Sequence, residues 1–141
     1  MLNATELQAV SDRCPFHRWL GLRVISVEEA GIAMEMHCKS DIVSSPERES
    51  IHGGVIAALI DTGGCYAVAA MLETKGLPTV TLNLDYHRAG FLGSGPLRIE
   101  AHVVHVGKTL GSAQARVLDV SGHLLASGRG VYHVAGATPL R

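Results

Sequence analysis

The sequence has few aromatic residues and no excess of either charge. Phe, Trp and Tyr make up 4% of its 141 residues, and 12 basic residues nearly balance 13 acidic ones, for a net charge of −1. Without a basic surface there is little attraction to phosphate backbones or anionic lipids, and few rings are available to stack on bases. We therefore expect neither nucleic acid nor a membrane to be the partner.

Cysteines are also scarce, and their spacing is uninformative. Cys14, Cys38 and Cys65 are odd in number and form no C-x-x-C pair. This indicates reduced thiols in a cytoplasmic protein, and the first seven residues lack the basic and apolar regions of a signal peptide. No pair of histidines has the spacing of metal ligands, so we expect no metal and no cofactor.

The order of the predicted elements is a hairpin, a long helix and then a meander of strands. The length is that of one domain, and we predict a single domain over 1–141, with a short helix at about 4–13 and a core at about 16–134. The predicted segments are strands from Leu22 with a turn at 28–31, a polar loop at 40–50, a helix at 52–72, and strands at 79–87, 97–106, 109–120 and 124–134. This order predicts an α+β fold, with an antiparallel sheet around one buried helix.

The run from 52 to 72 is apolar almost throughout, and Asp61 is its one acid. It is too long for one strand, and Lys75, Gly76 and Pro78 after it predict a helix end with Gly76 as the left-handed cap. Its length would span a bilayer, but an internal acid and the lack of flanking cationic anchors favour a core helix. An ionised carboxylate in such a helix is costly, which makes Asp61 a candidate for chemistry.

Gly53 and Gly54 begin this predicted helix. The first amides of a helix lack internal partners, and glycines let a carbonyl oxygen approach them closely, as in an oxyanion hole. A glycine pair more often serves simply to allow close packing, and the local sequence taken alone favours that interpretation. Asp61 equally has a structural alternative, as a buried acid satisfied by neighbouring donors.

Asp61 lies eight residues after Gly53. At 1.5 Å per residue the two are about 12 Å apart along one helix, so one site does not readily use both from a single chain. A symmetric dimer with its helices side by side would pair Gly53 of one copy with Asp61 of the other. Thr79 begins the next strand, which we take as central, on its polar face, from where its hydroxyl could hold a water beside Asp61.

Together these residues resemble the hotdog-fold acyl-CoA thioesterases of the phenylacetate-degradation (PaaI-like) type. The resemblance covers about residues 16–134 and rests on Ile51–Asp61 with its His-Gly-Gly, Thr79–Gly90, Gly107–Thr109 and the hairpin Asp119–Ala126. It implies hydrolysis of an acyl-CoA to the free acid and CoA, with CoA part of the substrate. It also implies a homodimer with a sheet continuous across the interface, often paired into a homotetramer, and active sites at the dimer interface.

The resemblance further implies roles for individual residues. Gly53 would donate its N–H to the thioester carbonyl, His52 would orient that site or the leaving thiolate, and Asp61 of the partner would act as general base or nucleophile. Thr79 would hold the water. The implied substrate-binding residues are Gly54, Arg88, Gly107 and Lys108. The chain departs from the family in the loop at 45–50, where many relatives carry an Asn and a Gly shortly before the His-Gly-Gly, and here Arg48 or Glu49 would instead reach the acyl group or the water.

Two other functions stay open at this point. Hotdog folds also catalyse hydration or dehydration. For that reaction His52 and Asp61 would have to converge on the α- and β-carbons of an enoyl group. A dimer that only binds acyl-CoA would need the same pocket without turnover.

Overall fold

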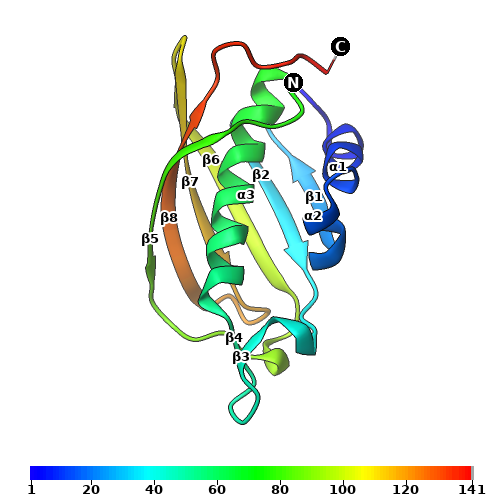
Figure 1. Ribbon diagram of the computed structural model, residues 1–141, viewed down its shortest axis with the longest axis vertical. Helices are drawn as coiled ribbons and strands as arrows, with labels where there is room; N and C mark the ends of the chain where they lie inside the picture. The colour runs from blue at the N-terminus through cyan, green and yellow to red at the C-terminus, as the bar shows by residue number, and fades with distance from the viewer. Residues whose placement is uncertain (141) are drawn as a thin grey trace.

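A curved antiparallel sheet wraps around one long helix, α3 (Gly53–Leu72), in this computed structural model (Figure 1). The structure describes residues 1–140; residue 141, the last of the predicted domain, lies outside them. The sheet has six strands in the order β1-β2-β6-β7-β8-β5. They are β1 (Leu22–Val27), β2 (Gly31–Met36), β5 (Thr79–Tyr86), β6 (Leu97–Val106), β7 (Leu110–Leu118) and β8 (Leu124–His133). The predicted hotdog architecture, a sheet around a central helix, is confirmed.

Alternation along the strands places apolar side chains against α3. On β2, Ile32, Met34 and Met36 are all buried, as their spacing predicts, because successive side chains of a strand point to opposite faces. Most of α3 is buried as well. The helix is long and apolar enough to cross a bilayer by length and composition, but 61% of its most apolar window lies inside the protein, as in a core helix.

A glycine pair in the middle of α3 lets the helix approach the sheet closely. A Cβ added at Gly63 would lie 2.7 Å from Ile99 Cγ2, and one at Gly64 would lie 2.3 Å from the Tyr132 hydroxyl. Glycine weakens a helix by roughly 1 kcal/mol relative to alanine, so its presence here is explained by this packing. The close approach lets the Tyr132 O–H donate to the backbone oxygen of Asp61, at 2.9 Å.

The end of α3 differs from the prediction. The helix stops at Leu72, and Glu73 rather than Gly76 takes the left-handed cap conformation, with φ 54°. The cap N–H of Glu73 donates to the oxygens of Ala69 and Ala70, which satisfies carbonyls that the helix leaves open. Both chain ends fix this region, because Leu2 N–H donates to Ala70 O and Leu140 N–H donates to Glu73 O.

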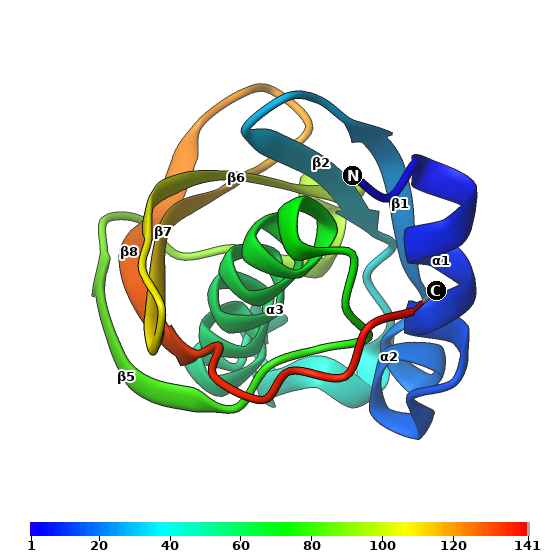
Figure 2. The ribbon, with the colours of Figure 1, turned by 90° about the horizontal axis from the view of Figure 1, so that it is seen from above.

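Two short helices cover the side of α3 that the sheet leaves open (Figure 2). They are α1 (Ala4–Asp12), capped by Asn3 and Glu6, and α2 (Pro15–Leu20). The sequence predicted α1, but Pro15 was taken only as its stop. Pro15 instead occupies the first turn of α2, where the missing N–H costs no hydrogen bond.

The remaining elements are short and lie near the beginning of α3. They are η1 (Ser40–Ile42), β3 (Val43–Ser45), β4 (Ser50–Ile51) and η2 (Leu92–Ser94). The strands β3 and β4 form a two-stranded hairpin within the predicted polar loop, and it projects beyond the sheet (Figure 1).

Strand β5 is an edge strand, so the expectation that Thr79 begins a central strand is wrong. It pairs with β8 on one side, and within residues 1–140 the structure pairs nothing with its other side. The first strand after α3, β5, therefore pairs with the last strand of the chain, β8, and not with β6, which follows it in the sequence. Local patterns do not reveal this order. The free edge is eight residues long.

Candidate active site

The beginning of α3 presents one free amide. His52 is the N-cap: its Nδ1 accepts from Gly54 N–H at 2.8 Å, and its backbone oxygen accepts from the N–H groups of Val55 and Ile56. A Cβ at Gly54 would lie 2.8 Å from His52 Nδ1, so this glycine lets the imidazole fold back over the helix. Within residues 1–140 no acceptor is assigned to the Gly53 N–H. The cap therefore takes the Gly54 amide and leaves the Gly53 amide for a ligand.

Tyr86, at the end of β5, fixes Gly53 from the other side. Its O–H donates to the Gly53 backbone oxygen at 2.6 Å, and a Cβ on Gly53 would lie 3.2 Å from that hydroxyl. The carbonyl of this peptide is thus held while the N–H of the same residue stays open. The helix dipole adds positive potential at this position, which suits a developing oxyanion.

Asp61 lies in the middle of α3 and is held by Thr79. The Thr79 O–H donates to Asp61 Oδ1 at 2.8 Å. Strict alternation would point Thr79 away from the partly buried Leu82, but a β-bulge intervenes: Thr79 pairs with Tyr132 and Thr81 with Val131, which leaves Val80 unpaired. The bulge turns Thr79 toward the helix, as bulges beside functional sites often do.

His17 on α2 reaches the same region. Its Nδ1 forms a hydrogen bond with the Tyr66 hydroxyl at 2.9 Å, and its Nε2 lies 3.4 Å from Thr62 Oγ1. Burial lowers the pKa of His17 below its ordinary value of 6.5, and the negative charge of Asp61 offsets part of this shift. The imidazole is therefore neutral near pH 7.

The other titratable groups beside Asp61 keep their protons. Burial raises the pKa of the Cys65 thiol to about 11 and that of the Tyr66 hydroxyl to about 12. Burial, with the nearby Asp61 charge, also raises the pKa of Tyr132. With these protons in place Cys65 is no nucleophile, and the groups of this region that can accept a proton are the carboxylate of Asp61 and the neutral imidazole of His17.

Asp61 and Thr79 open onto a cavity of about 670 Å³, which we call the α1–α3 cavity. It lies between one face of α1, the residue His17 of α2, the stretch of α3 after Asp61, and the segment 75–79, with Leu140 also in its wall. Its volume is typical of small-molecule sites.

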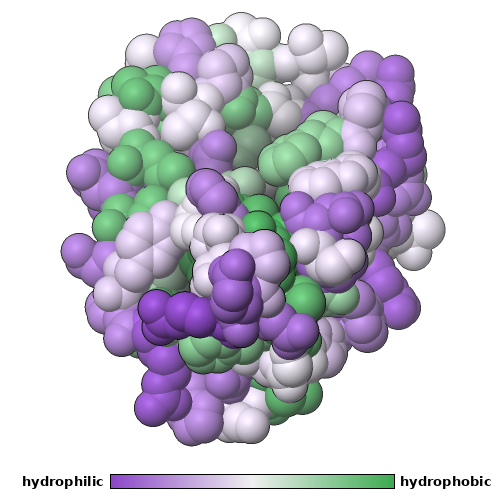
Figure 3. Space-filling model, turned by 60° about the horizontal axis from the view of Figure 1, so that its bottom comes forward, coloured by the Kyte–Doolittle hydropathy of each residue, from purple (hydrophilic) through white to green (hydrophobic). Residues whose placement is uncertain are grey.

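The predicted substrate-binding residues lie at two ends of the protein. Arg48 and Glu49 are exposed at the tip of the β3–β4 hairpin, and Arg88 follows β5 with its N–H donating to Leu125 O, so all three are near the start of α3. Figure 3, which turns this end toward the viewer, shows hydrophilic side chains projecting between hydrophobic ones.

Gly107 and Lys108 form the turn between β6 and β7 at the other end, where α3 finishes (Figure 1). A Cβ on nearby Gly111 would lie 2.9 Å from Val68, in the last part of the helix. One copy of the chain therefore does not bring Gly107 and Lys108 together with Arg88, although the sequence analysis grouped all three around the CoA tail.

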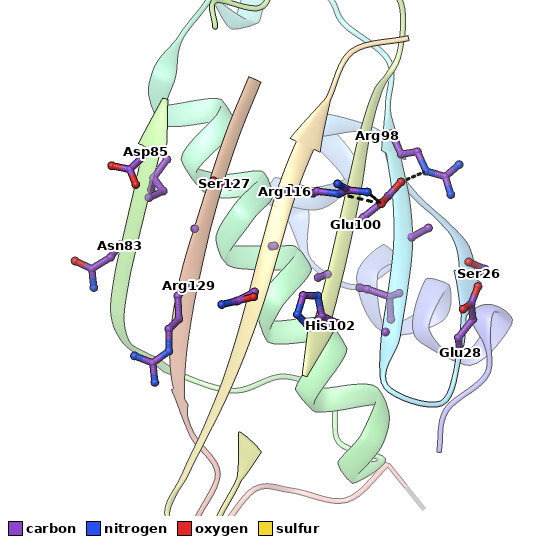
Figure 4. Close-up of a pocket in the computed structure, with 18 residues that line it drawn as sticks. Ser26, Glu28, Asn83, Asp85, Arg98, Glu100, His102, Arg116, Ser127 and Arg129 are labelled. Atoms are coloured by element: carbon purple, nitrogen blue, oxygen red, sulfur yellow. Dashed lines mark hydrogen bonds and ion pairs between the residues drawn. The ribbon is translucent and has the colours of Figure 1, made fainter. Parts of the chain in front are cut away.

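A larger hollow, of about 980 Å³, lies on the outer face of the sheet (Figure 4). Its central acid, Glu100, is paired with Arg98 at 2.9 Å and with Arg116 at 2.8 Å. The hydrogen bond from Arg116 is the main reason why the pKa of Glu100 lies below its ordinary value. A carboxylate held by two guanidinium groups is a poor base, so size alone does not make this hollow the active site.

Within residues 1–140 no three His, Cys, Asp or Glu side chains lie close enough together to hold a metal ion. The polar groups beside Asp61 are hydroxyls and an imidazole. Acid–base chemistry at a carbonyl is what this arrangement supports.

Comparison with known proteins identifies the family. The model of the thioesterase superfamily matches residues 49–126, which include Gly53, Asp61 and Thr79. The chain belongs to the thioesterase superfamily. Membership supports hydrolysis of thioesters in general.

Similar solved structures agree with this assignment. A thioesterase-superfamily protein solved by structural genomics is 41% identical, with a TM-score of 0.88 and coverage of 93% of this chain and 97% of its own. The E. coli PaaI protein from the phenylacetic acid degradation operon is 25% identical, with a TM-score of 0.80 and coverage of 96% and 98%. A Halobacterium salinarum protein with a provisional esterase name is 29% identical over 93% of this chain and 91% of its own. The resemblance to PaaI-like proteins stated from the sequence is confirmed.

Several residues of the site escaped the sequence analysis. His17 was missed because its neighbours in space, Thr62 and Tyr66, are more than 40 residues away in the chain. The Cys14-Pro15 step was a local signal for a new helix there. Tyr86 lies in the segment Thr79–Gly90 on which the resemblance rests, but nothing in the sequence marks its contact with Gly53.

Proposed function

We propose that this protein hydrolyses acyl-CoA thioesters at a site shared by two copies of the chain. The observation that carries the proposal is the pair formed by an open Gly53 amide and the Thr79-held carboxylate of Asp61. The proposal includes a reducing, cytoplasmic setting, in keeping with the free thiols of Cys14, Cys38 and Cys65.

The distance along α3 favours a shared site. Gly53 and Asp61 are eight residues apart on a continuous helix, about 12 Å along its axis. The free edge of β5 supplies a surface for a second copy, because a long unpaired strand edge is usually covered or paired. Val80 and Tyr86 on this strand are 52% and 54% exposed.

A two-fold axis through paired β5 strands would bring opposite ends of two copies together. The Gly53 end of one helix would then approach the middle of the other, and Gly107 and Lys108 of one copy would approach Arg88 of its neighbour. This arrangement accounts for the separation of the CoA-binding candidates within a single chain. Arg48 and Glu49 on the hairpin would lie at the rim of the same site. Pairing of two such dimers into a tetramer remains part of the proposal.

In the proposed reaction the thioester carbonyl oxygen accepts the Gly53 N–H of one copy. Asp61 of the other copy takes a proton from water, whose oxygen forms a bond to the carbonyl carbon. The tetrahedral oxyanion is stabilised at the helix start, and its collapse breaks the C–S bond and releases the thiolate of CoA. The proton held by Asp61 passes to the thiolate, which restores the base, and the carboxylic acid loses its own proton to solvent and leaves as its anion. Thr79 holds Asp61 in position, and direct attack by Asp61 is the alternative route to the same products.

Hydrolysis fits the site better than hydration of an enoyl group. In this structure His52 Nδ1 is used as the cap of α3, and within residues 1–140 the second base near Asp61 is the neutral His17, whose ring nitrogens contact the Tyr66 and Thr62 hydroxyls. A protein that only binds acyl-CoA would show saturable binding by calorimetry without thiol release from any acyl-CoA.

Mixing two inactive variants tests the shared site. Asp61→Asn removes the base, and Gly53→Pro removes the amide proton at a helix position where proline is tolerated. His52 already has φ −58° and ψ 130°, which suits the residue before proline. We expect each variant alone to lose at least about 10²-fold in thiol release from acyl-CoA.

Unfolding and refolding the two variants together at equal amounts should restore activity. Random pairing makes half of the dimers mixed, each with one intact site of two, so roughly one quarter of wild-type activity should return. Gly53→Ala, which keeps the N–H, serves as the steric control. Absence of recovery in dimers shown to be mixed would reject the shared site.

A further inference from the structure

We propose that the α1–α3 cavity binds the acyl group as an extended aliphatic chain, with Asp61 at one end and Leu140 closing the other. This inference rests on the proposed function, and it assigns the substrate class of that site. It concerns parts of the chain that lie outside the His-Gly-Gly and Asp61 motif: α1, the segment after α3 and the last residues.

The shape of the cavity is set by two helices. On α1, the lining residues Glu6, Ala9, Val10 and Arg13 follow the spacing i, i+3, i+4, i+7, which is one face of a helix. Their span is about 10 Å along the axis. A wall of this length on one side of α3 makes a channel rather than a compact pocket.

The far end of the channel lies near the end of α3. Leu140 lines the cavity, and its N–H donates to Glu73 O at 2.7 Å. The hydroxyl of Thr74 donates to Thr138 O at 2.8 Å and holds the same segment. Glu73 is twelve residues beyond Asp61, which corresponds to about 18 Å along a helix axis. Residues 138–140 thus form a strap across the end of the channel.

The chemistry of the wall favours an apolar chain over a polar acyl group. Ala9, Val10 and Leu77 present apolar surface. The polar pair in the wall, His17 and Tyr66, is hydrogen-bonded to itself at 2.9 Å. Among residues 1–140 no buried side-chain nitrogen or oxygen lacks a partner, so the buried part of the wall offers no unpaired donor or acceptor to a polar substituent.

The charged residues of the lining are compatible with an apolar acyl chain in the cavity. Arg13 and Lys75 are exposed, and Glu6 caps α1 by accepting from Asn3 N–H at 2.9 Å. Glu6 and Arg13 are thus the two ends of the α1 wall, and between them Ala9 and Val10 give it an apolar middle. Each methylene buried there should improve binding by roughly fourfold until the chain meets the strap.

The experiment measures kcat/KM by thiol release for straight-chain acyl-CoAs from acetyl to hexadecanoyl, with phenylacetyl-CoA for comparison. We expect the wild type to prefer octanoyl-CoA over acetyl-CoA at least tenfold. Ala9→Phe fills the channel and should lower this octanoyl-to-acetyl ratio at least tenfold. Thr5→Phe places the same side chain on α1 outside the cavity, and it should leave the ratio unchanged.

A second pair of variants tests the strap. Leu140→Ala should move the maximum of the chain-length profile to longer chains, and Leu140→Trp should move it to shorter ones, with unchanged melting temperatures as the check on folding. A ratio unaffected by Ala9→Phe, or a preference for phenylacetyl-CoA over every straight chain, overturns the inference while hydrolysis still stands. Absence of thiol release from every acyl-CoA by the wild type overturns the proposed function itself.

Discussion

Two carboxylates occupy hollows on opposite faces of one sheet, and their partners differ. On the outer face Glu100 lies between Arg98 and Arg116, as Figure 4 shows. On the concave side Asp61 receives one hydrogen bond from the neutral hydroxyl of Thr79, and no ion pair of residues 1–140 includes it. The larger hollow contains Glu100, which is paired with two arginines, and the smaller cavity contains Asp61, whose carboxylate forms no ion pair within residues 1–140.

The difference between the two faces lies in what each carboxylate can still do. Two guanidinium groups favour the ionised form of Glu100 and reduce its tendency to accept a proton. A hydroxyl orients Asp61 without neutralising its charge, which leaves it able to take a proton from water. The partners of an acid, rather than the size of the hollow around it, therefore identify the catalytic side of the sheet.

Substituting each acid in turn should give the largest difference in activity between the two faces. Asp61→Asn keeps an oxygen that can accept from Thr79 but removes the base, so thiol release from acyl-CoA should fall about 10²–10⁴-fold. Glu100→Gln removes the partner of two arginines on the outer face of the sheet and should leave the rate within about twofold, since Glu100 contacts no group of the proposed site. A dye assay for free thiol measures both. Equal losses in the two variants would contradict the assignment.

A smaller effect should follow from the hydroxyl that holds Asp61. Thr79→Val keeps the branched shape and the strand preference but removes the hydrogen bond to the carboxylate, for an expected loss in kcat of roughly tenfold. Thr79→Ser keeps the hydroxyl and should restore most of the rate. Thr81→Val, on the same strand and without contact to Asp61, is the matched control. A rate in Thr79→Val equal to wild type would show that the carboxylate needs no positioning.

The sequence predicted the elements whose signals are local. The hairpin, the long helix and the meander follow from alternation, from the apolar run and from turn residues, and the observed strands agree within a few positions. Residue type marked Gly53 and Asp61 as candidates, since a glycine at a helix start and an acid in an apolar run each need a reason, but their proposed roles came from the family resemblance. The wrong cap at Gly76 shows the limit of such signals, because Glu73 adopts the left-handed conformation when both chain ends hold it.

What the sequence did not predict depends on contacts between distant residues. The bulge that turns Thr79 toward Asp61 is a property of pairing with β8, so alternation within β5 alone gives the wrong face. The contact of His17 with Tyr66 and the closing of the α1–α3 cavity by Leu140 join segments far apart in the chain. These features can be predicted only when the arrangement of the elements in space is known, and local residue patterns do not specify that arrangement.

The free energy of unfolding should depend on pH in two separate pH ranges, one for each face of the sheet. The pKa of His17 is lowered in the folded state, mainly by burial, so the unfolded chain binds more protons below pH 6.5. Stability is therefore full above that pH and is lost as the pH falls toward the lowered pKa of His17. The melting temperature should decrease between pH 7 and pH 5 by a few degrees, and His17→Gln should remove this part of the decrease.

The outer face should respond only at lower pH, and weakly. The pKa of Glu100 is lowered below its ordinary value of 4.5, so its contribution is present above that pH and is lost as the pH falls through the folded value. Because this acid is partly exposed, the loss in Glu100→Gln should be at most about 1 kcal/mol near pH 7. The slope between pH 7 and pH 5 should then be the same in Glu100→Gln as in wild type. A changed slope between pH 7 and pH 5 would mean that the two faces are coupled through the sheet. That result would contradict the independent roles assigned to Asp61 and Glu100.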